Sequence, residues 1–106
     1  MAWFSLIVAG ILEVVWAFSM KQSEGFTKIG ASVVTIVTVV ASFILLSYSM
    51  KSLPLGTAYT IWTGIGAVGA FVVGIAFLGE PVGTLRILAA VMIIGGLLLM
   101  KFSSAV

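Results

Sequence analysis

Glu13 is the residue whose type and position point most directly to chemistry. It lies in the stretch GILEVVWAF at residues 10–18, inside an apolar run from Met1 to Met20 with no other charged side chain. A charged group within an apolar span costs about 2.5–3.5 kcal/mol on insertion scales and by default marks function. A carboxyl group there is neutral when alone and ionised beside a cation, which predicts a site for either a proton or a cation. The alternative is a permanently protonated glutamate that hydrogen-bonds a neighbouring helix.

Helical spacing places other candidate residues near this carboxyl group. Gly10 precedes Glu13 by one turn and Trp16 follows it by one turn, because residues three or four apart share a helix face. Two further faces carry polar or aromatic groups: Tyr59, Trp62 and Gly66 on one, and Thr35, Thr38, Ser42 and Ser49 on the other. Such a set suits a compact organic cation, with charge pairing from the carboxylate and cation–π contact from the rings. Interfacial anchoring of the aromatic residues and hydroxyl bonds to their own helix remain alternatives.

Small residues form a second pattern in the third apolar block. Gly66, Ala70 and Gly74 recur every four residues, a spacing that lets two membrane helices approach closely. Gly64 and Gly66 bracket Ile65 near the middle of the same block. We favour a packing role for these glycines, and a hinge at residues 64–66 is the alternative.

The composition excludes several classes of function. Hydrophobic residues make up 62% of the 106 residues and charged residues 8%, whereas a soluble domain carries about 25% charged residues. The chain has no cysteine and no histidine, which excludes disulfides, thiolate nucleophiles and Cys/His metal sites. A dispersed net charge of +2 does not favour nucleic acid binding. We therefore predict a membrane protein that is not an enzyme and that uses no metal and no cofactor.

Charged and turn-forming residues divide the chain into four apolar blocks. Each has roughly the 20 residues that a spanning helix needs, and a lone strand in lipid would leave its backbone groups unpaired. The sequence therefore predicts an all-α integral membrane protein with a single four-helix transmembrane domain over residues 1–106. The predicted spans cover residues 2–20, 29–50, 57–78 and 85–101.

The loop charges give almost no orientation signal. With four spans, Lys21, Lys28 and Arg86 face one side of the membrane, and Lys51, Lys101 and the amino terminus face the other. An excess of Lys and Arg normally fixes which side faces the cytoplasm. One alternative is a fixed orientation with a weak signal. The other is insertion in both orientations, so that two inverted copies form the two-sided pathway that transporters otherwise build from inverted repeats.

The chain resembles the small multidrug resistance family over essentially its full length. The resemblance rests on Glu13, on residues 20–21 closing the first span, on SEGF at residues 23–26, on Ser42, and above all on LPLGTAYTIWTGIG at residues 53–66. It implies an antiparallel, dual-topology homodimer in the bacterial inner membrane that exchanges cations for protons at paired Glu13 carboxylates. It also implies Tyr59 and Trp62 as site aromatics and a bend at residues 64–66.

The subtype depends on the residues around Trp16. The guanidinium exporters of the family are similar in having EVVWA at residues 13–17 and WTGIGA at residues 62–67, whereas quaternary ammonium exporters have a small residue in place of Trp16. In the guanidinium subtype, the resemblance implies that Trp16 and Ser42 help to hold the glutamates in a hydrogen-bonded stack. The planar fork of guanidinium matches a carboxylate in a bidentate manner.

These observations predict a proton-coupled exporter of guanidinium and small substituted guanidinium cations. The predicted site residues are Glu13, Trp16, Ser42, Tyr59 and Trp62, supported by Gly10, Thr38, Gly64 and Gly66. The alternatives within the family are an exporter of quaternary ammonium or aromatic cationic drugs and one half of a heterodimeric exporter. Outside that class, the alternatives are a passive channel and a structural or regulatory membrane subunit.

Overall fold

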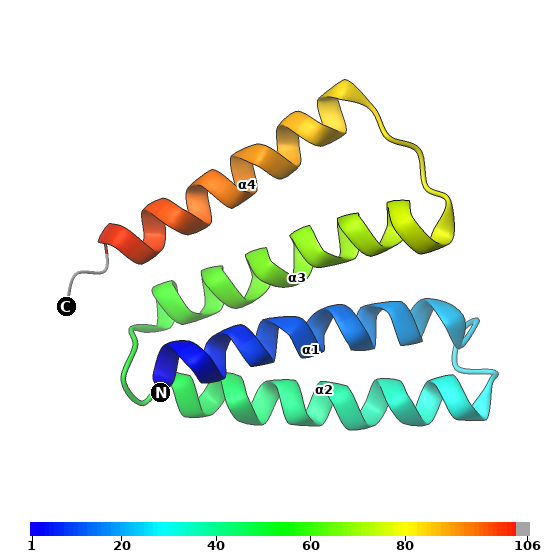
Figure 1. The fold of residues 1–106 in the computed structure, drawn as a ribbon. Coiled ribbons are helices and arrows are strands. Elements are labelled where there is room, and N and C mark those ends of the chain that lie inside the picture. The colour runs from blue at the N-terminus through cyan, green and yellow to red at the C-terminus, as the bar shows by residue number, and fades with distance from the viewer. Residues whose placement is uncertain (104–106) are drawn as a thin grey trace.

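Four long helices make up the fold. The computed structural model describes residues 1–103, which form α1 (Ala2–Gln22), α2 (Ile29–Ser49), α3 (Leu55–Leu78) and α4 (Thr84–Ser103) (Figure 1). Each helix is long and apolar enough to cross a membrane. The predicted all-helical architecture with four candidate spans is therefore confirmed for the described residues. The antiparallel pairing of two copies stays a prediction.

Local backbone signals set the ends of α3. The helix begins at Leu55, directly after Pro54, whose missing N–H costs least at a helix start. At its other end, Gly79 adopts the left-handed conformation with φ of 68°, which glycine takes without steric cost. The N–H of Glu80 then donates to the carbonyl oxygen of Gly74 at 3.1 Å and turns the chain back over the helix. This turn fixes where the Glu80 side chain leaves the backbone.

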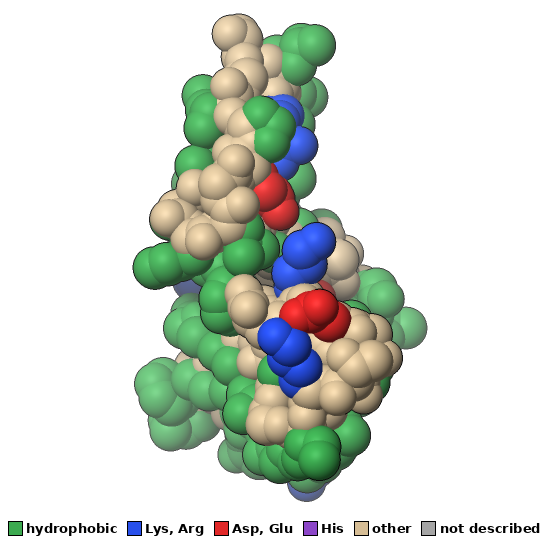
Figure 2. Space-filling model, turned by 90° about the vertical axis from the view of Figure 1, so that its right-hand side faces the viewer, with side chains coloured by type: hydrophobic (Ala, Val, Ile, Leu, Met, Phe, Trp, Pro, Cys, Tyr) green, Lys and Arg blue, Asp and Glu red, His purple; other side chains and the backbone are tan. Residues whose placement is uncertain are grey.

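The helices are not packed equally. α1 lies between α2 and α3, while α4 packs against α3 and diverges from it toward the 79–83 loop (Figure 1). No residue of α4 is buried. The loops that join α1 to α2 and α3 to α4 lie at the same end of the molecule, and charged side chains gather there (Figure 2). The opposite end holds the amino terminus and the loop between α2 and α3.

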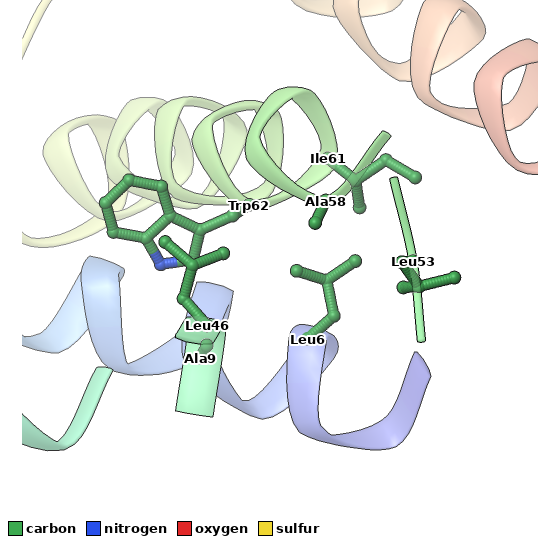
Figure 3. Close-up of a cluster of buried hydrophobic side chains, with 7 residues drawn as sticks. All are labelled: Leu6, Ala9, Leu46, Leu53, Ala58, Ile61 and Trp62. Atoms are coloured by element: carbon green, nitrogen blue, oxygen red, sulfur yellow. The ribbon is translucent and has the colours of Figure 1, made fainter. Parts of the chain in front are cut away.

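The buried core occupies only one half of the bundle. It comes from the first turns of α1, the last turns of α2, the loop between α2 and α3, and the first turns of α3. It consists of Leu6, Ala9, Leu46, Leu53, Ala58, Ile61 and Trp62 (Figure 3). The other half of the α1–α3 interface leaves an open cavity of about 290 Å³ that is lined by apolar side chains and Ser19. Glu13 lies on α1 between these two halves.

Candidate cation-binding site

The carboxyl group of Glu13 lies against the backbone of α3. A Cβ atom added to Gly66 would overlap the Glu13 carboxyl carbon and Oε1, so the absence of a side chain at residue 66 creates the space that the carboxyl group fills. Oε1 of Glu13 is buried, and among residues 1–103 it has no hydrogen-bond partner. A buried acceptor without a donor costs about 1–3 kcal/mol. A proton or a cation at this oxygen would remove that cost.

Trp16 contributes a second unpaired group to the same part of α1. It follows Glu13 by three residues and therefore lies on the same side of the helix. Its indole Nε1 is buried and, within the described part of the chain, donates to no acceptor. One unpaired acceptor and one unpaired donor thus lie one turn apart on α1. The role of Trp16 at the site stays a prediction.

A buried hydrogen-bond chain ties the three inner helices together one turn before Glu13. The indole Nε1 of Trp62 on α3 donates to Oγ of Ser42 on α2 at 3.0 Å. The Ser42 hydroxyl then donates to the carbonyl oxygen of Ala9 on α1 at 2.8 Å. Since Ala9 precedes Glu13 by four residues, the same carbonyl oxygen is the helical acceptor for the Glu13 N–H. Ser42 and Trp62 are therefore in direct contact, and their roles in cation binding stay predictions.

This hydrogen-bond chain bears on the implied role of Ser42. A hydroxyl group has one proton to donate, and in this conformation it goes to Ala9. A hydrogen bond from Ser42 to Glu13, which the family resemblance implies, therefore stays a prediction. It requires the hydroxyl to leave the Ala9 carbonyl.

An aromatic group surrounds Trp62. The ring centroids of Tyr59 and Trp62 are 5.6 Å apart, and those of Phe43 and Trp62 are 5.5 Å apart, both with tilted planes. Tyr59 and Phe43 are exposed, whereas Trp62 is buried. Phe43 is absent from the candidates found in the sequence. Its position directly after Ser42 was the available signal, but neighbours on a helix point in different directions, so adjacency alone did not place it beside Trp62.

The supporting residues serve different contacts. A Cβ at Gly10 would overlap Ile65 of α3, whereas a Cβ at Gly64 would overlap Leu97 of α4. Gly64 and Gly66 therefore face different neighbours although they are two residues apart, and α3 is continuously α-helical through both. A hinge at this position stays a prediction.

In this conformation the Thr38 hydroxyl contacts its own helix, whereas the Ser42 hydroxyl bonds another helix. The Thr38 hydroxyl lies 2.7 Å from the carbonyl oxygen of Val34 and 3.1 Å from that of Thr35, both on its own helix. The supporting role of Thr38 in cation binding also stays a prediction.

Glu13 is electrostatically isolated from the other charged groups. The ion pairs in residues 1–103 are Lys28 with Glu24, at 2.7 Å, and Arg86 with Glu80, at 3.6 Å, and all four residues lie in or beside the loops. In the same part of the chain, no group of three or more His, Cys, Asp or Glu side chains is placed to hold a metal ion. The chemistry available at the site is therefore that of one carboxyl group, indole and phenol rings, and a hydroxyl group.

Comparison with known proteins gives full-length matches. Residues 1–104 match the family model described as Small Multidrug Resistance protein. A protein of Yersinia pseudotuberculosis serotype I named Guanidinium exporter is 50% identical over 104 residues, covering 98% of this chain and 100% of that relative. Proteins of the same name from Salmonella typhimurium (strain LT2) and Citrobacter freundii are 49% and 46% identical, and each match covers 98% of this chain and 99% of the relative.

Proposed function

Because the chain belongs to the small multidrug resistance family, we propose that it is a proton-coupled exporter of guanidinium and small substituted guanidinium cations. As a member of a transporter family with four candidate spans, it is a multi-pass membrane protein and not an enzyme. Relatives named Guanidinium exporter, at up to 50% identity over 98% of the chain, support this cargo. The bacterial origin of these relatives supports a location in the inner membrane.

The observation that carries the proposal is the unpartnered carboxyl oxygen of Glu13. It is buried between α1 and α3 and faces no donor from the described residues. A guanidinium ion supplies two parallel N–H donors together with a positive charge, which match a carboxylate in a bidentate manner. A proton on the same carboxylate removes its charge and so the cost of burying that charge. Proton and cargo therefore compete for one group, and this competition couples their movement in opposite directions.

The remaining candidate residues have roles that follow from their positions. The rings of Tyr59 and Trp62 lie 5.6 Å apart and offer faces for cation–π contact with a planar cation. The indole N–H of Trp16 is unpaired among the described residues and is available to orient a carboxylate oxygen. The Ser42 hydrogen-bond chain fixes α2 and α3 relative to the turn of α1 that precedes Glu13.

We further propose that the working unit is an antiparallel homodimer. Alternating access needs two related halves in inverted orientation, and the nearly balanced loop charges allow one chain to supply both. α4 has no buried residue, so its apolar side chains leave a large surface for contact with a second copy. In such a dimer, two Glu13 carboxyl groups would serve one cargo ion. Lipid, guanidinium, protons and the second copy are the proposed partners.

The experiment that tests the function is solid-supported-membrane electrophysiology on the purified, reconstituted chain. Guanidinium pulses are expected to give transport currents that change with an imposed pH gradient, and tetraalkylammonium pulses are expected to give much smaller ones. Glu13→Gln keeps the size of the side chain but cannot exchange a proton, so it should abolish the coupled current. Coupled guanidinium transport by Glu13→Gln would overturn the proposal.

A further inference from the structure

The charged end of the bundle contains a carboxylate that the proposed transport cycle does not yet use. Glu80 follows the left-handed Gly79, and its N–H bonds the carbonyl oxygen of Gly74 at 3.1 Å. The side chain folds back over α3, because a Cβ added to Gly74 would overlap the Glu80 carboxyl group. A glycine on α3 therefore makes room for this carboxylate, as Gly66 does for Glu13.

A cavity of about 130 Å³ lies between α1 and α3 beneath this carboxylate. Glu80 and Lys21 are its charged lining residues, one from the 79–83 loop and one from the last turn of α1. It shares the lining residues Val14, Phe18 and Val73 with the neighbouring cavity of about 290 Å³. Val14 directly follows Glu13 in the chain, so the hollow half of the interface reaches the turn of α1 that carries Glu13, although Glu13 itself lines neither cavity.

Within the described residues, Lys21 and Glu80 do not pair with each other, because Glu80 pairs with Arg86. Its Oε1 lies 3.6 Å from Nη2 of Arg86 on α4, which is longer than the ~2.7–2.9 Å of a strong charge-assisted hydrogen bond. The Arg86 guanidinium also lies over the ring of Phe71, 5.2 Å from its centre. Both members of the pair remain close to half exposed, at 46% and 43%. The Glu80–Arg86 contact is therefore loose and solvated, so it can exchange partners at low cost.

We propose that Lys21 and Glu80 form a gate at the charged end of the α1–α3 cavity, and that Glu80 exchanges Arg86 for Lys21 when the cavity closes. In the conformation described here, Glu80 pairs with Arg86 on α4 and the cavity is open. When the end of α3 moves toward α1, the carboxylate leaves Arg86 and pairs with Lys21 across the narrowed cavity. Discrete ion-pair arrangements of this kind are a common basis for two-state movement between packed elements. The gate rests on the proposed function, since it matters only if cargo passes between α1 and α3.

Conservative and non-conservative changes at Lys21 test the charge requirement. Lys21→Met should lower the guanidinium current about fivefold, because a partly exposed ion pair contributes that much to one of two states. Lys21→Arg keeps the charge and should retain at least about half of the wild-type current. Lys28→Met is the matched control, because Lys28 lies at the same end but pairs with Glu24 and does not line the cavity. Equal losses for Lys21→Met and Lys28→Met would assign the effect to general surface charge and overturn the gate.

Arg86→Met tests whether Glu80 acts in the gate or only holds α4 in place through its ion pair with Arg86. In the gate, Arg86 pairs with Glu80 only in the open state, and this long, half-exposed contact contributes little there, so its removal should leave Glu80 and Lys21 able to open and close. The variant should retain at least about half of the wild-type current, while Glu80→Gln should lose about fivefold. If Arg86→Met loses as much guanidinium current as Glu80→Gln, Glu80 acts through its ion pair with α4, and the proposal is overturned.

Disulfide trapping tests the closed state directly. The chain has no native cysteine, so no other thiol in it competes with the introduced pair. In Lys21→Cys/Glu80→Cys, oxidation by copper phenanthroline removes two thiol hydrogens and should form a disulfide within one chain. The cross-link should abolish the guanidinium current, and dithiothreitol should restore the current of the reduced variant. Lys28→Cys/Glu80→Cys should cross-link at least about tenfold more slowly. No cross-link within the chain, or full current after cross-linking, would overturn the gate.

The result for the unmodified chain separates the two proposals. If the wild type gives no proton-coupled guanidinium current, the proposed function fails whatever the cysteine pair does. If the wild type transports guanidinium and cross-linking leaves the current unchanged, the gate alone fails.

Discussion

The two halves of the α1–α3 interface differ in how they are filled. In the half nearest the amino terminus, Leu6 and Ala9 of α1 pack against Ala58 and Trp62 of α3, and the first two are fully buried. In the other half, the side chains that face each other leave cavities of about 290 Å³ and 130 Å³. Tight packing fixes positions, whereas a hollow interface permits movement.

Glu13 lies at the boundary between these halves, which fits what a coupled transporter needs. The packed half and the Ser42 hydrogen-bond chain hold the turn of α1 that precedes Glu13. The hollow half begins at Val14, which lines both cavities. One side of the carboxylate is therefore positioned and the other is free to rearrange.

The largest effect is expected from alanine at Gly66. The added Cβ would overlap the Glu13 carboxyl group, which must then move from its position. Misplacing a reacting group by about 1 Å costs on the order of a hundredfold in rate, so guanidinium transport should fall by about that factor. Transport currents and guanidinium-dependent tryptophan fluorescence measure the loss, and size-exclusion chromatography confirms folding.

Gly69→Ala is the matched control for Gly66→Ala. It also introduces an overlap, but with Val14, whose side chain lines both cavities and has space to move. Transport should therefore fall less than about threefold. If both variants lose transport equally, the boundary between a fixed and a hollow half does not lie at Glu13.

The next largest effect is expected on the free energy of unfolding, and it compares the packed half of the α1–α3 interface with the hollow half. Leu6 is fully buried in the packed core, so Leu6→Ala should lower the free energy of unfolding by about 2–5 kcal/mol. Val73 borders both cavities, and Val73→Ala enlarges a space that already exists, so it should cost less than about 1 kcal/mol. Unfolding titrations in detergent micelles measure both. Equal losses would show that the hollow half is filled in the folded protein under these conditions.

A smaller loss is expected at Ser42. Alanine there removes the donor to Ala9 and leaves the Trp62 N–H buried without an acceptor, at a cost of about 1–3 kcal/mol. Ser49→Ala is the control, because Ser49 is equally buried on α2 but its hydroxyl donates to the carbonyl oxygen of Leu46 on its own helix. The same unfolding titration should show a smaller loss for Ser49→Ala. If Ser49→Ala lowers the free energy of unfolding more than Ser42→Ala does, the hydrogen bond between α2 and α1 is not what stabilises this part of the bundle.

Much of this arrangement follows from the sequence, because helix ends and helix faces are local properties. Pro54 and Gly79 mark the ends of α3, and the helical period places Glu13 and Trp16 on one side of α1. Distances between helices are not local. The period groups Thr38 with Ser42, yet only the Ser42 hydroxyl bonds another helix, because the vertical position of α2 against α1 decides which residue faces Ala9.

At the charged end too, the sequence does not predict how side chains from different elements meet. The sequence places Lys21, Glu80 and Arg86 near span ends, but it does not indicate that the Glu80 side chain folds back over Gly74. That direction depends on the left-handed turn at Gly79 and on how α3 and α4 diverge. The dimer and its paired glutamates are still harder to predict from the sequence, because they depend on contacts between two copies of the chain.

The smallest effect is expected from the cation–π contact at the packed end. The ammonium group of Lys101 on α4 lies 4.8 Å from the centre of the Trp3 ring on α1. Such contacts contribute about 0.5–1 kcal/mol at exposed sites, so Lys101→Met should lower the free energy of unfolding in micelles by that amount. Lys51→Met is the control, since Lys51 lies 5.8 Å from the Tyr48 ring and joins no second helix, and its loss should be smaller. Equal losses would mean that charge at this end, and not the contact between α4 and α1, stabilises the packed half.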